Sequence, residues 1–297
     1  MALPTETVYG LAADAINPMA VAKVFEIKER PRFDPLITHL PDREWLQRVA
    51  HEETDVVSEL IEKFWPGPLT VLLRKRPLIP DIVTAGLDTV AVRMSAHPVF
   101  ARMARQLARP IAAPSANLFG RVSATTARHA LDELGGRIPL IVDGGPTTHG
   151  LESTIVRVVD GKIEILRRGP ITREMLEDVA PFVARAHNER IVAPGQSPSH
   201  YAPRTKLIVI ESWHDFEPRD EKRIAALRFG SASTDPRISV ERCLSERKDL
   251  REAAANLFRM LRELDAEKPD LIVAELLPER GLGAAINERL RRAAAAR

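Results

Sequence analysis

Two cations, a proline-bounded turn and a later small polar turn are the residues of this chain that could hold a polyphosphate. Lys28 and Arg30 open residues 28–36, and Ser115-Ala116-Asn117 and Ser123 follow downstream. Lysine and arginine bring positive charge to phosphates, while serine and asparagine offer hydrogen-bond donors of little bulk. Each feature is weak by itself, because a basic pair after a helix is more often a solvated face. Together they predict an anion site built without a Walker loop.

Patterns for other nucleotide and metal chemistries are missing from the sequence. It contains neither GxxxxGK[ST] nor HExxH. Gly281-x-Gly283 is not a dinucleotide fingerprint, because Ile286 occupies the third glycine position. The single cysteine, Cys243, excludes an intramolecular disulfide and a cysteine-based zinc site, which fits a reducing compartment.

The composition is that of a globular chain with no excess of either charge. Its 297 residues are 44% hydrophobic, enough for one large core or two modest ones, and the formal net charge is +2. So small a charge disfavours an extended nucleic-acid-binding face, although it allows a local basic pocket. No apolar run reaches membrane-spanning length and no signal-peptide pattern opens the chain. We therefore expect a cytoplasmic protein that makes no membrane contact.

Hydrophobic periodicity and capping residues predict the elements that would carry these side chains. Asn17-Pro18 starts a helix that delivers Lys28 and Arg30 at its far end. Further helices are expected at 53–64, 97–107 and 171–182, and strands at 36–40, 69–73, 90–94, 110–113, 139–142, 153–158 and 163–167. Because helices and strands do not alternate strictly, we predict an α/β sheet that includes antiparallel pairs.

A change of composition divides the chain. Residues 186–203 are rich in Pro, Gly and Ser without periodicity, which indicates a linker between residues 1–185 and 204–297. Beyond it, strands are expected at 207–210, 224–227 and 271–274, and helices at 248–265 and 282–295. This βα alternation predicts a small second domain with a parallel sheet.

The motifs, taken in order, resemble the YrdC-like threonylcarbamoyl-AMP synthases. The resemblance rests on residues 3–11, on Lys-x-Arg-Pro, on Ala-Pro-Ser-Ala-Asn, and on residues 143–145, 152–156 and 166–169. His200-Tyr201-Ala202-Pro203 and residues 281–287 are similar to the longer, two-domain branch of that family. Several motifs in the same order carry more weight than any one of them.

The resemblance implies a fold, a reaction and partners. The fold would be a YrdC-like twisted mixed sheet with helices forming a concave basic cleft, plus a smaller Rossmann-like α/β domain with a parallel sheet. The enzyme would be a nucleotidyltransferase that makes threonylcarbamoyl-AMP and pyrophosphate from L-threonine, bicarbonate and ATP, with Mg²⁺. The product would serve the threonylcarbamoyladenosine modification of tRNA, through a tRNA threonylcarbamoyltransferase complex.

The resemblance also assigns roles to residues of this chain. Lys28 and Arg30 would be catalytic and face the triphosphate, and no protein side chain would bind the metal directly. The ATP site would comprise Arg30, Asp34, Thr89, Ser115, Asn117, Ser123, Arg167 and Tyr201. The threonine site would comprise Thr7, His39, Arg93, Ser153 and the backbone of Ala113. The linker would fold over the cleft and bring Tyr201 to the nucleotide.

Some of these residues have simpler interpretations. A lone histidine such as His39 is more often a packed, hydrogen-bonded side chain, and Arg167 suits an ordinary ion pair. On the simpler interpretation, Tyr201 would anchor the second domain by packing. Asp34 stands where the family usually has Asn, and its carboxylate would repel phosphate unless Arg32 or Mg²⁺ neutralised it.

Two further expectations concern the start of the chain and its function. Met1-Ala2-Leu3-Pro4 already lies in an expected strand, whereas members of the resembled family normally carry a helix and the start of this strand ahead of it. Either the start codon was placed too late or this copy lacks these elements, and their loss would lower stability. The alternatives to the synthase are a YrdC-like module that binds double-stranded RNA or tRNA without synthesis, and a relative that has lost the reaction.

Overall fold

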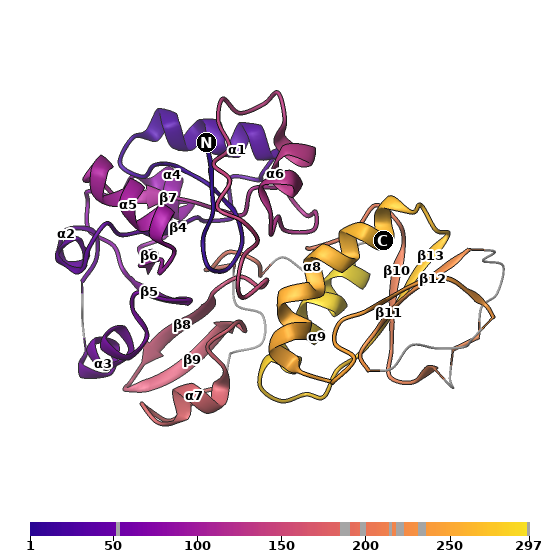
Figure 1. Ribbon diagram of the computed structural model, residues 1–297. Coiled ribbons are helices and arrows are strands. Elements are labelled where there is room, and N and C mark those ends of the chain that lie inside the picture. Colours follow the sequence, from indigo (N-terminus) through magenta and orange to yellow (C-terminus); the bar gives the residue numbers. More distant parts are fainter. Residues whose placement is uncertain are drawn as a thin grey trace. The chain divides into compact units, whose positions relative to one another are not determined.

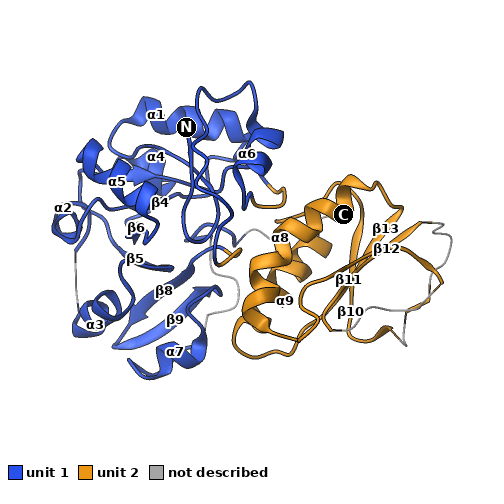
Figure 2. Ribbon diagram, viewed as in Figure 1, with its two compact units in different colours: residues 1–119, 124–148, 152–197 blue, residues 120–123, 149–151, 198–297 orange. Residues whose placement is uncertain are grey.

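The computed structural model describes residues 1–51, 54–184, 191–196, 200–213, 216–217, 223–230 and 236–295. The chain forms two compact units (Figure 2). The first comprises residues 1–119, 124–148 and 152–197, and the second comprises residues 120–123, 149–151 and 198–297.

A seven-stranded mixed sheet organises the first unit (Figure 1). Its order is β3 (Ala13–Asp14), β7 (Ile111–Ala112), β4 (Ile37–His39), β6 (Thr89–Arg93), β5 (Leu69–Arg74), β8 (Thr154–Val159) and β9 (Lys162–Arg167). The pairs β4–β6 and β5–β8 are parallel and the others are antiparallel. Short strands β1 (Ala2–Leu3) and β2 (Gly10–Leu11) pair beside it. The predicted α/β sheet with antiparallel pairs is therefore confirmed.

Both faces of this sheet are buried, and alternation along the strands decides which side chains lie on each. Val90 and Val92 of β6 belong to the main apolar core. Ala91, between them, belongs to a smaller apolar cluster with Ile37, Leu72, Ile155, Leu166 and Ala193. Arg93 lies two residues after Ala91 on β6, and His39 lies two residues after Ile37 on β4, so both side chains are on the same side of the sheet as this smaller cluster. We call this second side the polar face, because it carries buried charged and polar residues among few apolar ones.

The helices of the first unit begin and end at recognisable signals. In α1 (Pro18–Lys28), the Asn17 side chain accepts hydrogen bonds from the backbone of Met19 and Ala20, and Glu29 ends the helix with φ 54°. The others are the 3₁₀ turn η1 (Arg43–Trp45), α2 (Leu46–Val49), α3 (Asp55–Phe64), α4 (Asp81–Thr84), α5 (Pro98–Leu107), α6 (Ala127–Leu134) and α7 (Arg173–Glu177). Helix α1 therefore places Lys28 at its end, as predicted.

The second unit is built on a parallel sheet, as expected. Its order is β10 (Leu207–Ile210), β13 (Leu271–Glu275), β11 (Ile224–Arg228) and β12 (Ile238–Cys243). Helices α8 (Leu250–Ala266) and α9 (Leu282–Ala294) pack against each other, on the same side of the sheet in Figure 1. Strand β12 was not predicted, although Ile238 and Val240 alternate with the polar residues Ser239 and Glu241.

Two predicted elements differ from the structure. The strand expected at 139–142 is wrong, since Ile141 makes only an isolated bridge to Ala2 at the edge of the unit. The helix expected at 171–182 is reduced to α7, and Phe182 instead bridges to Ile163 of β9. Of the predicted linker, residues 186–190 and 197–199 lie outside the described residues.

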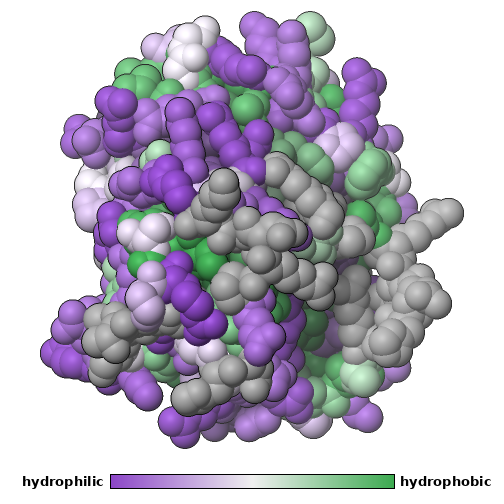
Figure 3. All heavy atoms as spheres, turned by 90° about the vertical axis from the view of Figure 1, so that its right-hand side faces the viewer, coloured by the Kyte–Doolittle hydropathy of each residue, from purple (hydrophilic) through white to green (hydrophobic). Residues whose placement is uncertain are grey.

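The described residues hold no helix long and apolar enough to cross a membrane. Figure 3 shows one face of the molecule, on which hydrophilic residues predominate and hydrophobic ones lie scattered between them. Scattered apolar residues of this kind are normal on a protein surface.

Burial predicts which leucines matter for stability. Leu60 of α3 is fully buried in the main core, whereas Leu131 of α6 is 48% exposed. Leu60→Ala should lower the free energy of unfolding by about 2–5 kcal/mol, because it leaves a cavity in a close-packed core. Leu131→Ala is the matched control, with an expected change below about 1 kcal/mol. Denaturant titration measures both, and equal effects would contradict this assignment of the core.

Candidate active site

The first buried group on the polar face surrounds Arg93, and we call it the Arg93 cluster. The guanidinium donates through Nη2 to Glu6 Oε1 at 2.5 Å, through Nη1 to Thr7 Oγ1 at 3.0 Å and through Nε to the carbonyl of Gly67 at 3.1 Å. The second carboxylate oxygen of Glu6 accepts from Ser95 Oγ at 2.5 Å. These interactions, led by the charge of Arg93, outweigh burial and lower the pKa of Glu6 to about 2. The Glu6 carboxyl group is therefore ionised at neutral pH.

His39 lies beside this cluster on the neighbouring strand. It is paired in register with Arg93 across β4 and β6, and its ring packs on Phe100 with centroids 4.7 Å apart. Burial, followed by the charge of Arg93, lowers the pKa of His39 to about 3. The imidazole is thus neutral at pH 7 and too weak a base to accept a proton there.

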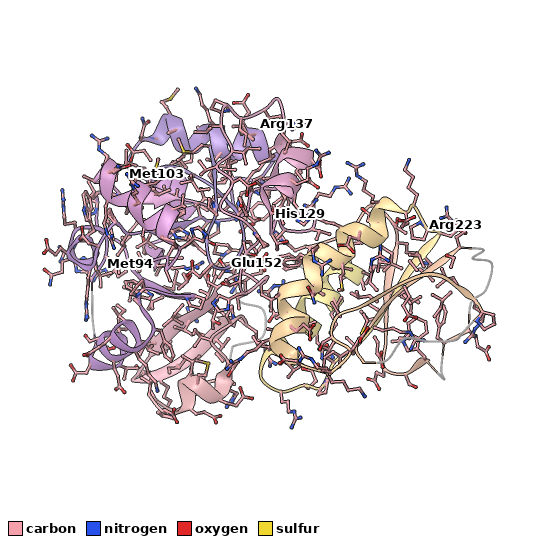
Figure 4. The ribbon with its side chains drawn as sticks, viewed as in Figure 1. Met94, Met103, His129, Arg137, Glu152 and Arg223 are labelled. Carbon is pink, nitrogen blue, oxygen red and sulfur yellow. The ribbon has the colours of Figure 1, made fainter. Side chains whose placement is uncertain are left out.

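The second group, the Lys28 cluster, joins the end of α1 to the small polar turn after β7. Lys28 is buried and its Nζ donates to the carbonyls of Ser115, at 2.5 Å, and Asn117. Burial, reinforced by the charge of Arg30, holds the pKa of Lys28 well below its ordinary value. Glu152, which is labelled in Figure 4 and precedes β8, acts in the opposite direction. The predicted lysine and the predicted turn are therefore neighbours.

Asp34 pairs with Arg30 and not with Arg32, which the sequence analysis named as a group that could neutralise it. Arg30 Nη2 lies 3.0 Å from Asp34 Oδ2, and its guanidinium also donates to the carbonyls of Asp34 and Pro35 at 3.0 and 2.8 Å. Arg32 is exposed. The hydrogen bond from Asp34 N to Pro31 O closes a turn, and this turn brings Asp34 back to Arg30. Burial raises the pKa of Asp34, and the Arg30 charge opposes that rise.

The third group, the Arg167 cluster, lies where β8 and β9 meet. Arg167 donates through Nε and Nη2 to the carbonyl and the hydroxyl of Ser153, both at 3.0 Å. The Ser153 hydroxyl is also 2.8 Å from that of Thr70 on β5. The charge of Arg167, like that of Arg30, opposes the rise that burial causes in the pKa of Asp34, so the Arg167 and Lys28 clusters are electrostatic neighbours.

Residues 191–196, part of the predicted linker, pack on this polar face. Ala193 belongs to the smaller apolar cluster, and the carbonyl of Pro194 accepts from Arg167 Nη1 at 3.3 Å. Gln196 donates to the carbonyl of Leu166 at 3.4 Å and accepts from the backbone of Ala193. This part of the linker thus lies against the strands that carry the candidate site.

Ala113 hydrogen-bonds His39 through its backbone. Thr89 stands apart from the clusters of the first unit, and two predicted residues belong to the second unit. Ala113 is buried, and its backbone N–H donates to Ile37 O at 3.1 Å. Thr89 begins β6 and lies about 13 Å along the strand from Arg93, at roughly 3.3 Å per residue. Ser123 and Tyr201 belong to the second unit.

Those two residues are anchored within the second unit. The carbonyl of Ser123 accepts from Arg262 Nε at 3.4 Å. Tyr201 stacks on Phe258 with centroids 5.6 Å apart, and the Arg289 guanidinium lies 5.0 Å from its ring. Tyr201 therefore packs within the second unit, in agreement with the simpler interpretation. The nucleotide-binding roles of Ser123 and Tyr201 stay predictions.

Sequence reasoning missed residues that hold the predicted ones. Glu6 and Ser95 position Arg93, and Thr70 positions Ser153. Glu6 lies between Thr5 and Thr7 in residues 3–11, the first segment that resembles the family. An acidic residue within an otherwise buried segment could have indicated that Glu6 has a charged partner. Among the described residues, His, Cys, Asp and Glu side chains form no group of three or more that could hold a metal ion.

Family models match both halves of the chain. One described as telomere recombination, for Sua5, YciO and YrdC proteins, matches residues 1–169. Another, described as threonylcarbamoyl-AMP synthase, C-terminal domain, matches residues 171–295. The chain belongs to the Sua5 family of two-domain threonylcarbamoyl-AMP synthases.

Whole relatives agree with the models. The threonylcarbamoyl-AMP synthase of Pyrococcus abyssi (strain GE5 / Orsay) is 39% identical, over 99% of this chain and 89% of its own length. That of Bacillus subtilis (strain 168) is 40% identical, over 100% and 90%. The crystal structure of P. abyssi Sua5 complexed with L-threonine superposes with a TM-score of 0.90 at 38% identity, over 100% of this chain and 90% of that one. The predicted family and fold are thus confirmed.

The lowered pKa values predict a stability that falls in acid. The unfolded chain takes up a proton on histidine near pH 6.5, whereas folded His39 resists until about pH 3. Stability should therefore decline as the pH falls through this window, by up to about 1.4 kcal/mol per pH unit for one proton. Glu6 adds a further loss as the pH falls from about 4.5 towards 2.

Unfolding titrations at pH 7, 6 and 5 isolate the histidine contribution. His39→Gln should flatten the decline, because it removes the histidine whose pKa folding lowers to about 3. An unchanged slope in His39→Gln would show that another group causes the decline.

Proposed function

We propose that this protein is a nucleotidyltransferase that makes threonylcarbamoyl-AMP and pyrophosphate from L-threonine, bicarbonate and ATP. Its match to threonylcarbamoyl-AMP synthases along the whole chain, at 39–40% identity, carries the proposal. The buried cations Lys28, Arg30, Arg93 and Arg167 of the first unit supply the charge that two anionic substrates need.

In this proposal the Arg93 cluster receives the amino acid. Its three contacts occupy one N–H on each guanidinium nitrogen, so Nη1 and Nη2 each keep a second donor for the threonine carboxylate. Glu6 fixes the plane of the guanidinium. Thr7, His39, Ser153 and the Ala113 backbone complete the threonine site, and the neutral imidazole adds no charge to it.

The Lys28 and Arg167 clusters receive ATP. Lys28 supports the turn that presents Ser115 and Asn117. A nearby ATP phosphate would favour the protonated form of Lys28, whose third N–H would donate to a phosphate oxygen. Arg30, Arg167, Asp34, Thr89, Ser123 and Tyr201 are the other proposed nucleotide contacts. Mg²⁺ would enter on the ATP phosphates, which is its usual manner of binding in such enzymes.

The chemistry needs alignment more than a nucleophilic side chain. The threonine nitrogen attacks the carbon of CO₂ formed from bicarbonate and loses a proton, giving a carbamate. A carbamate oxygen then bonds to the α-phosphorus while the bond to the β-phosphate oxygen breaks, and pyrophosphate leaves. Fixed cations stabilise the charge that spreads over the transferring phosphorus.

The linker would act as a lid that keeps water from the product. The packing of residues 191–196 on the polar face supports this, because Arg167 holds the Pro194 carbonyl beside Ser153. A mixed carbamic–phosphoric anhydride hydrolyses easily, so exclusion of water preserves it. The product would then pass to the tRNA-modifying transferase, in the cytoplasm.

Pyrophosphate release with ATP, magnesium and bicarbonate, with and without L-threonine, tests the reaction. Release should depend on threonine and fall at least about 100-fold in Lys28→Ala, as when a preorganised donor is removed. Lys23→Ala, an exposed lysine of the same helix, is the control. Folded Lys28→Ala and Lys28→Gln proteins with wild-type rates would remove Lys28 from the site.

Asp34→Asn should lower the KM for ATP. The substitution removes a buried negative charge next to the phosphate site and releases Arg30 from its ion pair. Asp160→Asn, exposed in the β8–β9 turn with φ 49°, is a matched control, because Asn accepts that conformation. An unchanged or raised KM would show that the Asp34 carboxylate does not oppose ATP binding.

Glu6→Gln should raise the KM for L-threonine about tenfold or more while altering the KM for ATP little, since charge-assisted hydrogen bonds orient Arg93. Ser95→Ala, which removes only the hydroxyl behind Glu6, should show a smaller effect in the same direction. Equal increases in both KM values would indicate general loss of structure rather than a role at the threonine end.

A further inference from the structure

The second unit contains a cavity at the carboxyl edge of its parallel sheet. Its volume is about 420 Å³, within the range of about 300–1,000 Å³ that is typical of small-molecule sites. Glu211 follows β10, Phe229 follows β11 and Glu275 ends β13, and all three line it. Open α/β sheets bind ligands at this edge, beyond the carboxyl ends of their strands.

The cavity presents unpaired charges of both signs. Within the described part of the chain, neither Glu211 nor Lys248 forms an ion pair, and Glu275 accepts one long hydrogen bond, from Phe229 N at 3.4 Å. Arg291 and Glu279, also in the lining, neutralise each other at 2.5 Å. Two carboxylates and one ammonium group are thus left facing the space.

The backbone is shaped to place Lys248 there. Lys248 has φ 57°, a conformation that is costly for a residue with a Cβ. Its side chain crosses Gly230, where φ is 117° and an added Cβ would lie 2.6 Å from Lys248 Cε. A larger residue at position 230 would displace the lysine, so glycine permits the close approach.

Another part of the cavity lining is held by hydrogen bonds within the unit. Asn287 of α9 is fully buried, and its carboxamide accepts from Leu277 N at 2.8 Å and donates to Leu277 O at 2.7 Å. The turn after β13 is therefore fixed to α9. This part of the lining is preformed, so its backbone needs no ordering on binding.

We propose that this cavity binds a small zwitterion of the amino-acid class, with its ammonium group at Glu211 and Glu275 and its carboxylate at Lys248. Charge complementarity sets both ends, and the apolar side chains of Phe229 and Leu277 contact the part between them. This site is separate from the Arg93 cluster and is independent of the proposed reaction.

Calorimetric titration of the full chain with each proteinogenic L-amino acid tests the proposal. At least one amino acid should bind with a stoichiometry of one per chain. For L-threonine, the expected stoichiometry is two per chain, because one molecule would bind at the Arg93 cluster and a second in this cavity. Lys248→Met and Glu275→Gln should each weaken this binding about tenfold or more, because each removes a charge-assisted contact. Glu246→Gln, an exposed carboxylate just before Lys248, should leave the affinity unchanged.

Two results would overturn the proposal. One is that no amino acid at millimolar concentration gives heat that depends on Lys248 and Glu275, in variants whose melting temperatures match the wild type. The other is that ethylamine or acetate binds the cavity as tightly as any amino acid, which would make it a site for a single charge. Tighter binding of the zwitterion than of either fragment supports it.

Discussion

Buried charge is the constraint on which the first unit depends. Removing an ion from water costs free energy unless an ion-pair partner or hydrogen bonds replace its hydration. Each buried cation of the polar face therefore needs such partners. Arg93 has Glu6, Arg30 has Asp34, Lys28 has two carbonyls, and Arg167 has Ser153. These contacts fix the side chains in place, which is what recognition of two anions requires.

The same constraint explains how the sheet is used. The main core occupies one side of the strands with valine, leucine and isoleucine, and stability comes largely from that side. The other side is free to carry polar residues, because the strands are already held by hydrogen bonds to their neighbours. A mixed sheet with one apolar side and one polar face therefore provides both the scaffold and the candidate site.

The sequence predicted helices and strands well where residues close in sequence determine the structure. Asn17-Pro18 capped α1, and the valine-rich segment around residue 91 gave β6. Elements that depend on neighbours were predicted poorly. Residues 139–142 look like a strand but only Ile141 has a bridging partner, and β12 becomes a strand by pairing with β11.

The candidate site could be predicted as a set of residues but not as a set of contacts. Lys28 and the turn at Ser115 are 87 residues apart, and only the fold shows that they touch. The pairing of Asp34 with Arg30 depends on the turn at Pro31, which no periodicity encodes. Residues such as Glu6, which act through another side chain, are identified only by the hydrogen bonds they make.

The most direct test of the account is identification of the product by mass spectrometry. The full chain would be incubated with ATP, magnesium, L-threonine and ¹³C-labelled bicarbonate. The account predicts threonylcarbamoyl-AMP that carries one labelled carbon and is missing when either threonine or ATP is omitted. Consumption of ATP by the folded protein without a labelled, threonine-containing nucleotide would contradict it.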